Sequence, residues 1–208
     1  MSSNLLRCTH RAFVVLVLVA TFGSIQAQEM KERELKPAFD LTGMQMPIEI
    51  VEIKLNGKVV GAGEKIIGND DWLRGASFTL KNVSDKPIAY LAISFKFTLP
   101  KRIVVYMLSY GVDISRGDQR RDSSPPAIQP GDSLNLVITK ERYESFLHIL
   151  EQGGVSPRFD VAPYYIDRIS FENEPDVIWE GGYLLRRDPT QIHNFDRIGK
   201  YVVPNREQ

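Results

Sequence analysis

Cysteine is almost absent from this sequence, which holds Cys8 alone among its 208 residues. Cys8 precedes the apolar part of the N-terminal segment, whereas a lipoprotein signal places its cysteine after that part. We therefore expect no lipid anchor at Cys8, and no thiol at all once the segment is removed. Without thiols the working protein has no disulfide, no thiolate nucleophile and no cysteine-ligated metal. An apolar core must then provide its stability.

Histidine is also scarce, since His10, His148 and His193 are the three in the chain. His10 lies in the N-terminal segment, which leaves His148 and His193. Two distant histidines without cysteine disfavour a zinc site, and the sequence contains no G-x-S-x-G nucleophile elbow. A Ser-His-Asp triad is defined by geometry and could still be assembled in space. We expect His148 to form a surface pair with Glu144. The sequence thus predicts neither a cofactor nor a metal site.

Acidic residues occur in three turns, but none has the spacing of a twelve-residue calcium loop. The three turns are Asn69-Asp70-Asp71, the loop from Asp113 to Asp122, and Glu172-Asn173-Glu174-Pro175-Asp176. We expect each to be a solvated turn.

An excess of one charge is missing too, because 26 Lys and Arg residues balance 26 Asp and Glu residues. Loss of Arg7 and Arg11 with the N-terminal segment would leave a slightly acidic chain. No basic stripe of the kind that binds nucleic acid is present. Charge-driven binding to a membrane surface is equally unsupported.

The first 27 residues have the layout of a signal peptide, with a basic start and an uncharged stretch from Ala12 to Ala27. The small residue Ala27 favours cleavage between Ala27 and Gln28. The alternative is an uncleaved anchor, but a spanning helix needs about 20 apolar residues and this stretch is shorter. We therefore expect an exported protein, periplasmic or secreted, with no stable membrane anchor after cleavage.

Behind the signal we expect a flexible lead-in at 28–46, a β-sandwich domain at 47–187, and an irregular C-terminal tail at 188–208 that packs on the domain. Period-two alternation predicts strands over 72–80 and 88–97. The uninterrupted apolar run 103–108 predicts a central strand covered on both faces.

Local signals predict two turns of the chain in more detail. Asn56-Gly57 is typical of a tight hairpin. The apolar parity changes between Ile50 and Val51, which predicts a β-bulge or burial on both faces.

One helix is predicted at about 139–152, with Thr139 as its N-cap and Gly153-Gly154 at its end. Its apolar stripe recurs at helical spacing and consists of Tyr143, Phe146, Leu147 and Leu150. Many short strands with one connecting helix predict a mainly β fold, an immunoglobulin-like antiparallel β-sandwich.

Trp179 and Tyr183, beside Gly181-Gly182, form the candidate partner surface, although aromatic residues of this kind also pack in cores. Four nearby carboxylates leave open a small hydrolase that acts on glycan or peptide; they are Glu172, Glu174, Asp176 and Glu180. Two short motifs are weak signals. Arg116-Gly117-Asp118 resembles an adhesion tripeptide, and Asn82-Val83-Ser84 matches the N-glycosylation pattern.

Three stretches resemble small exported bacterial β-sandwich proteins of uncharacterised function. These are residues 80–88, with the turn Asn82-Val83-Ser84-Asp85-Lys86-Pro87, residues 128–134, with Gln129-Pro130-Gly131-Asp132, and residues 179–189, with Trp-x-Gly-Gly-Tyr and Arg186-Arg187-Asp188-Pro189. The resemblance covers about a third of the chain. It implies a fold and a compartment and carries no activity.

The leading hypothesis is therefore an exported, non-enzymatic domain that binds another macromolecule in the envelope or outside the cell, or serves as an envelope accessory. Its sheet edges and loops would supply the contacts. The alternatives are the carboxylate-dependent hydrolase near Trp179 and a structural domain without a ligand.

Overall fold

A computed structural model describes residues 29–40, 43–113, 124–188 and 190–204; for Ile192 and His193 it describes the backbone alone. The expected signal segment, with its predicted cleavage between Ala27 and Gln28, lies outside these residues, and so does the Arg116-Gly117-Asp118 motif. Over the described ranges, no helix has the length and apolar character needed to span a membrane.

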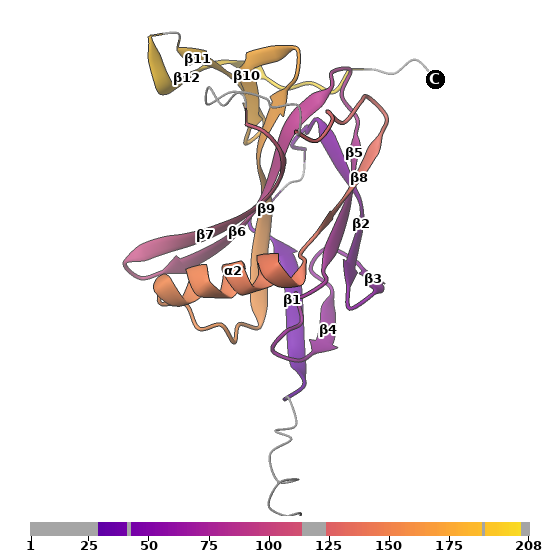
Figure 1. Cartoon of the computed structure of the whole chain (residues 1–208), viewed down its shortest axis with the longest axis vertical. Helices are drawn as coiled ribbons and strands as arrows, with labels where there is room; N and C mark the ends of the chain where they lie inside the picture. Colours follow the sequence, from indigo (N-terminus) through magenta and orange to yellow (C-terminus); the bar gives the residue numbers. More distant parts are fainter. Residues whose placement is uncertain (1–28, 41–42, 114–123, 189, 205–208) are drawn as a thin grey trace, which may run out of the picture.

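The fold is mainly β, with 55% of residues in strands and 8% in a helix, which confirms the expected β-sandwich. Two sheets and one helix form its body (Figure 1). Sheet A contains eight strands: β1 (Lys31–Pro37), β4 (Lys65–Gly68), β6 (Ile88–Leu99), β7 (Arg102–Gly111), β9 (Val161–Phe171), β10 (Glu174–Glu180), β11 (Tyr183–Asp188) and β12 (Gln191–Lys200). Sheet B contains four strands: β2 (Ile48–Leu55), β3 (Lys58–Val60), β5 (Ser77–Asn82) and β8 (Ser133–Val137).

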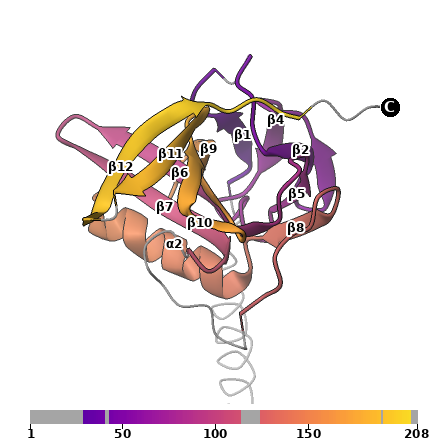
Figure 2. The ribbon, with the colours of Figure 1, turned by 90° about the horizontal axis from the view of Figure 1, so that it is seen from above.

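The long strand β9 organises sheet A. It pairs antiparallel with β6 along one edge. On the other edge it pairs parallel with β1 near its start and antiparallel with β10 near its end. The β1–β9 pair is therefore a parallel exception in a sheet that we expected to be antiparallel. Strands β10, β11 and β12 form a meander that stands at one end of the sandwich (Figures 1 and 2).

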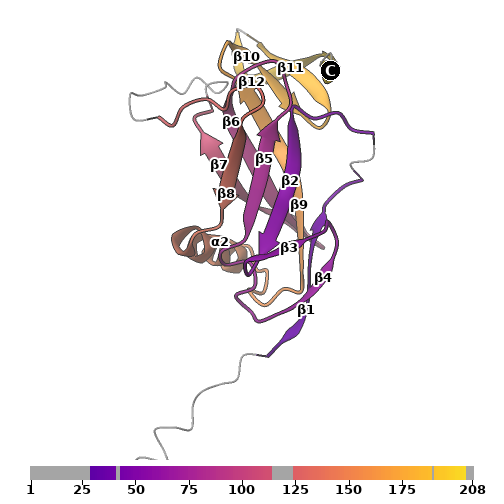
Figure 3. The ribbon, with the colours of Figure 1, turned by 90° about the vertical axis from the view of Figure 1, so that its right-hand side faces the viewer.

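Sheet B has the order β3-β2-β5-β8 and is seen face-on in Figure 3. The β2–β3 hairpin turns at Asn56 and Gly57, whose φ angles of 50° and 76° are the positive values that a tight hairpin of this kind requires. The β2–β5 register shifts between Ile50 and Glu52, which confirms the predicted bulge and leaves Val51 as its extra residue.

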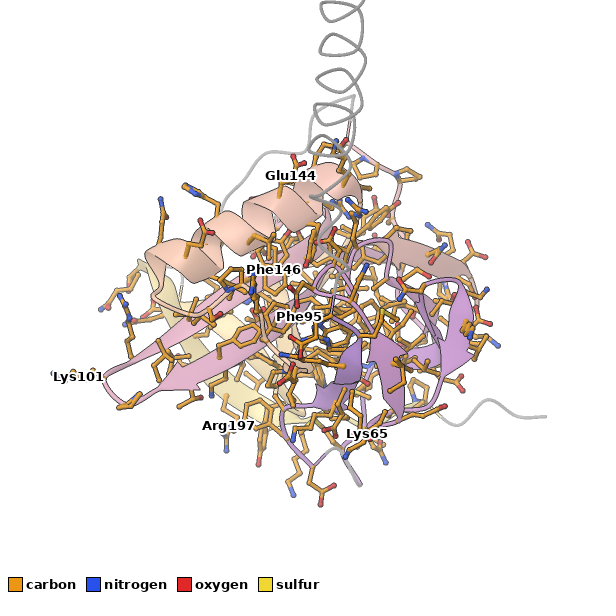
Figure 4. All side chains as sticks on the ribbon, turned by 90° about the horizontal axis from the view of Figure 1, so that it is seen from below. Lys65, Phe95, Lys101, Glu144, Phe146 and Arg197 are labelled. Atoms are coloured by element: carbon orange, nitrogen blue, oxygen red, sulfur yellow. The ribbon has the colours of Figure 1, made fainter. Side chains whose placement is uncertain are left out.

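The helix α2 (Lys140–Gln152) connects β8 to β9, with Thr139 as its N-cap. Its stripe residues Tyr143, Phe146 and Leu150 are buried, as predicted. Figure 4 shows Phe146 and Phe95 in the interior beneath the helix, whereas Glu144 lies on its outer side. Five aromatic rings surround Phe146, namely Phe95, Phe97, Tyr106, Tyr143 and Phe159.

Three sequence-based expectations about single segments are wrong. The lead-in contains β1, in which Arg33 and Leu35 are buried. Because one of the two buried residues is an arginine, the sequence shows no apolar alternation that would indicate this strand. The tail contains β12, which pairs with β11 through largely polar residues. The apolar run 103–108 belongs to β7, which pairs with β6 alone among the described strands, so that Ile103 and Val105 are 55% and 40% exposed.

Two buried tyrosines are expected to make the fold sensitive to alkali. Burial raises the pKa of Tyr143 and that of Tyr201 from 10 to about 12, because it disfavours the phenolate. The folded pKa lies above the unfolded one, so this contribution to stability is complete below pH 10. It is lost as the pH rises from 10 through about 12.

We expect Tyr143→Phe to unfold at a higher alkaline pH than the wild-type protein, as followed by circular dichroism during a base titration. Tyr110→Phe serves as the control, because the Tyr110 hydroxyl donates to Pro126 O at the surface. Equal alkaline midpoints for Tyr143→Phe and the wild type would contradict the assignment.

Candidate functional site

A groove of about 1070 Å³ opens where the β2 edge of sheet B faces sheet A. We call it the β2 groove. Residues 48–53 of β2 form one side, and Pro37 of β1 and Tyr164 of β9 contribute from the opposite sheet. Val59 and Val60 extend the lining onto β3, the second strand of the β2–β3 hairpin. The groove therefore belongs to both layers of the sandwich.

Residues 44–46 and the C-terminal residues Val203 and Pro204 form another wall of the β2 groove. Gln45 fixes this wall from two directions. Its backbone carbonyl accepts a hydrogen bond from Trp179 Nε1 at 3.2 Å, and its side-chain Oε1 accepts one from the backbone N–H of Val203 at 2.7 Å. The meander and the C-terminal segment thus hold the wall in place.

The lining of the β2 groove is mainly apolar, and its charged side chains are Glu49 and Glu52. Glu52 already contacts Lys54, with 2.7 Å between Oε1 and Nζ. Glu49 is exposed and lies opposite Lys81 in the β2–β5 register. Among the described residues, the charged side chains that line the groove are therefore acidic, with Lys54 and Lys81 beside them outside the lining.

A smaller hollow of about 380 Å³ is lined by Gly43, Met44 and Gln45 together with Tyr183 and Tyr201. The Gly181-Gly182 turn of the β10–β11 hairpin borders it. Gly182 has a φ of +89°, and a Cβ there would stand 3.3 Å from Met44 Cγ. The positive φ favours glycine at this position, and the missing Cβ leaves room for the Met44 side chain.

The structure separates the two predicted partner-surface residues. Trp179 is fully buried, so its assignment to a partner surface is wrong; its indole instead supports the groove wall through Gln45. Tyr183 is half-buried and lines the smaller hollow, where the Arg197 guanidinium lies 3.5 Å from its ring centroid. Trp179 is buried because the meander of β10, β11 and β12 folds over Gln45, which is distant from it in the sequence. Such a long-range contact leaves no signal in the local sequence.

Three carboxylates near Trp179 are each engaged with a cation. Glu174 contacts Lys86 at 2.6 Å, Asp176 contacts Arg186 at 3.3 Å, and Glu180 contacts Arg168 at 3.2 Å. These contacts distribute the carboxylates over separate ion pairs.

The acidic turns and the histidine also have structural partners. Asp70 contacts Arg33, and Asp71 contacts Arg74. In the part of the chain that the structure describes, no group of three or more potential metal ligands occurs. His148 Nε2 lies 2.9 Å from Gln152 Nε2, and Glu144 Oε1 lies 3.9 Å from Lys140 Nζ, so His148 and Glu144 have other partners and the expected pair between them does not form.

Asn82 is a buried structural residue rather than an accessible glycosylation site. It is 1% exposed. Its Nδ2 donates to Lys86 O and to Ile128 O, and its Oδ1 accepts from the Ser84 N–H and from Ser84 Oγ. The amide thereby closes the β5–β6 turn against the segment that precedes β8. A glycan on Nδ2 would break these contacts.

We expect Asn82→Asp to lower the free energy of unfolding by about 2–4 kcal/mol, because an acceptor oxygen would then face two buried carbonyls. Urea unfolding measures this effect. Asn56→Asp is the matched control, since Asn56 occupies an exposed hairpin turn that aspartate also tolerates. A loss no greater than that of the control would mean that the Asn82 hydrogen bonds contribute little.

No protein-family model, no curated protein and no solved structure matches the chain. The resemblance to exported bacterial β-sandwich proteins therefore stays a prediction. The β2 groove, with its wall held by Gln45, is the feature of the described structure that is best suited to bind a ligand.

Proposed function

We propose that this protein is an exported, non-enzymatic β-sandwich domain that binds another macromolecule in the β2 groove. One observation carries the proposal: a mainly apolar groove of about 1070 Å³ lies between the two sheets and has a wall held by Gln45. Apolar concave surfaces with a few placed polar groups are the usual form of a binding site.

Binding is favoured over hydrolysis because of where the charged groups lie. The β2 groove contains Glu49 and Glu52, and Glu52 contacts Lys54. The carboxylates near Trp179, which motivated the hydrolase alternative, contact Lys86, Arg186 and Arg168. Each of these three carboxylates already contacts a cationic side chain, whereas the apolar surface of the β2 groove is open to a ligand.

Export is the second part of the proposal and rests on the N-terminal segment of the sequence. Its test is the intact mass of the protein recovered from outside the cytoplasm. A chain that starts at Gln28 supports the proposal, and a chain that retains residues 1–27 contradicts it.

The binding part is tested by retention of partners from the native envelope fraction. Val51 lines the groove and is 53% exposed, so Val51→Lys changes the groove without opening the core. Ile67 on β4 is 63% exposed and does not line the groove, so Ile67→Lys is the matched control. We expect a retained partner to be lost with Val51→Lys alone. Equal retention by both variants would contradict the proposal.

A further inference from the structure

The edge of β2 that faces the groove is only partly paired. On one side β2 pairs with β5 over residues 48–54, with the bulge at Val51. On the other side β3 pairs with residues 53–55 alone, because β3 ends at Val60. Across the described ranges, no strand lies beside residues 48–52 on the β3 side. These five residues leave an edge about 16 Å long, at about 3.3 Å per residue.

The unpaired edge and the β2 groove coincide, because residues 48–52 all line the groove. An unpaired edge offers backbone N–H and C=O groups to an incoming strand. A concave surface beside such an edge also offers contacts for alternate side chains of that strand. Together these features define strand addition, one of the general modes of peptide recognition.

The side chains of β2 set the chemistry of such a strand. Ile48 and Ile53 face the core, whereas Glu49 and Glu52 lie on the more exposed face. Side chains of an added strand alternate in the same way, so one set would meet apolar residues and the other would meet carboxylates. Opposite charges on neighbouring strands are favourable, and like charges are unfavourable.

We infer that the ligand of the β2 groove is an extended polypeptide segment with alternating apolar and basic residues, which joins sheet B as a strand beside residues 48–52. This inference rests on the proposed function and specifies its partner. Glu49 contributes more than Glu52 to the choice of basic residues, because Glu52 is in contact with Lys54, whereas Glu49 lies opposite Lys81 in the register without forming an ion pair with it. The binding energy comes from backbone hydrogen bonds and apolar contacts, and the charges select the sequence.

Other ligand classes fit this groove less well. The acidic lining repels a nucleic acid backbone. The aromatic residue in the lining is Tyr164, which is 2% exposed, so no accessible ring is available for stacking against a sugar. A strand-forming peptide uses both the edge and the apolar lining.

The test is fluorescence anisotropy with the exported protein and a short labelled peptide of alternating valine and lysine. A peptide of alternating valine and glutamate tests the charge. A valine–lysine peptide with alternate backbone nitrogens methylated tests the strand, because it lacks the N–H groups needed for pairing. We expect each changed peptide to bind at least about tenfold more weakly than the first.

The protein variants locate the binding site. Val51→Lys is expected to weaken binding of the valine–lysine peptide by about tenfold, because it adds a positive charge and bulk at the edge. Ile67→Lys should leave the affinity within about twofold. Equal binding of the methylated and unmethylated peptides, or equal binding by the two variants, would overturn strand addition at β2.

Failure of the inference can be told apart from failure of the proposed function. If Val51→Lys abolishes retention of an envelope partner while no valine–lysine peptide binds, the groove binds a ligand of another class and the inference is wrong. If Val51→Lys changes neither retention nor peptide binding, the groove is not the binding site and the proposed function itself is wrong.

Discussion

Replacing Arg33 by alanine is expected to lower the free energy of unfolding by about 3–5 kcal/mol, because it removes a buried guanidinium that makes two ion pairs with partly exposed carboxylates and two buried hydrogen bonds to backbone carbonyls. The Arg33 side chain is 1% exposed. Its guanidinium donates to Asp70 Oδ1 at 2.8 Å, to the carbonyl of Phe159 at 2.9 Å, and to Asp160 Oδ1. Its Nε donates to the carbonyl of Gly68 at 3.3 Å.

These bonds join three segments that are distant in the sequence: β1, the end of β4 with the turn after it, and the loop before β9. Trp72 Nε1 donates to the same Phe159 carbonyl at 3.1 Å. Alanine would leave the Gly68 carbonyl without its guanidinium donor in the interior. It would also remove the nearer of two cations beside Asp70, since Arg158 Nε lies 3.4 Å from Asp70 Oδ2, so the loss should exceed that of an ordinary surface substitution.

The matched control is Lys65→Ala, which breaks an ion pair between the same two strands, β1 and β4. Lys65 contacts Glu32 at 3.0 Å, and both side chains are more than half exposed. An exposed pair contributes little, so we expect almost no change in the urea midpoint. Similar losses for Arg33→Ala and Lys65→Ala would show that the Arg33 network does not hold the three segments together.

Phe146→Ala is the second substitution with a large expected effect, a loss of about 3–5 kcal/mol of unfolding free energy. Phe146 is fully buried. Its ring centroid lies 4.8 Å from that of Tyr106 on β7 and 5.6 Å from those of Phe95 on β6 and Phe159. The residue attaches α2 to both strands of the β6–β7 hairpin, so its removal leaves a cavity between helix and sheet.

Phe39→Ala is the control for the loss of an aromatic ring, because Phe39 is 47% exposed and contacts Tyr165 at the surface. We expect it to cost well under half of the Phe146 effect. The measurement is urea unfolding followed by tryptophan fluorescence, with Trp72 and Trp179 as buried reporters. A Phe146 variant as stable as the wild type would contradict the assignment of α2 to the core.

Features governed by neighbouring residues could be predicted from the sequence. The Asn56-Gly57 hairpin, the bulge at Val51 and the buried stripe around Phe146 all follow from backbone preferences or periodicity within a short window. The structure confirms each of them. Local physical chemistry alone determines these elements.

Features that depend on distant pairing could not be predicted. The parallel pairing of β1 with β9 joins segments more than a hundred residues apart, and the charged sequence of β1 gives little local sign of a strand. Arg33 is buried because Asp70 and Asp160 reach it from other segments. The β2 groove likewise needs Gln45 to meet both Trp179 and Val203, which no periodicity in the sequence reveals.

Strand addition at β2 is the central claim, and backbone amide hydrogen exchange of residues 48–52 tests it most directly. The measurement compares the protein alone with the protein saturated with the valine–lysine peptide. We predict that the amides on the β3 side of residues 48–52 exchange at least about tenfold more slowly when the peptide is bound, because each gains a backbone partner. Unchanged exchange over residues 48–52 in the peptide-bound protein would contradict the claim.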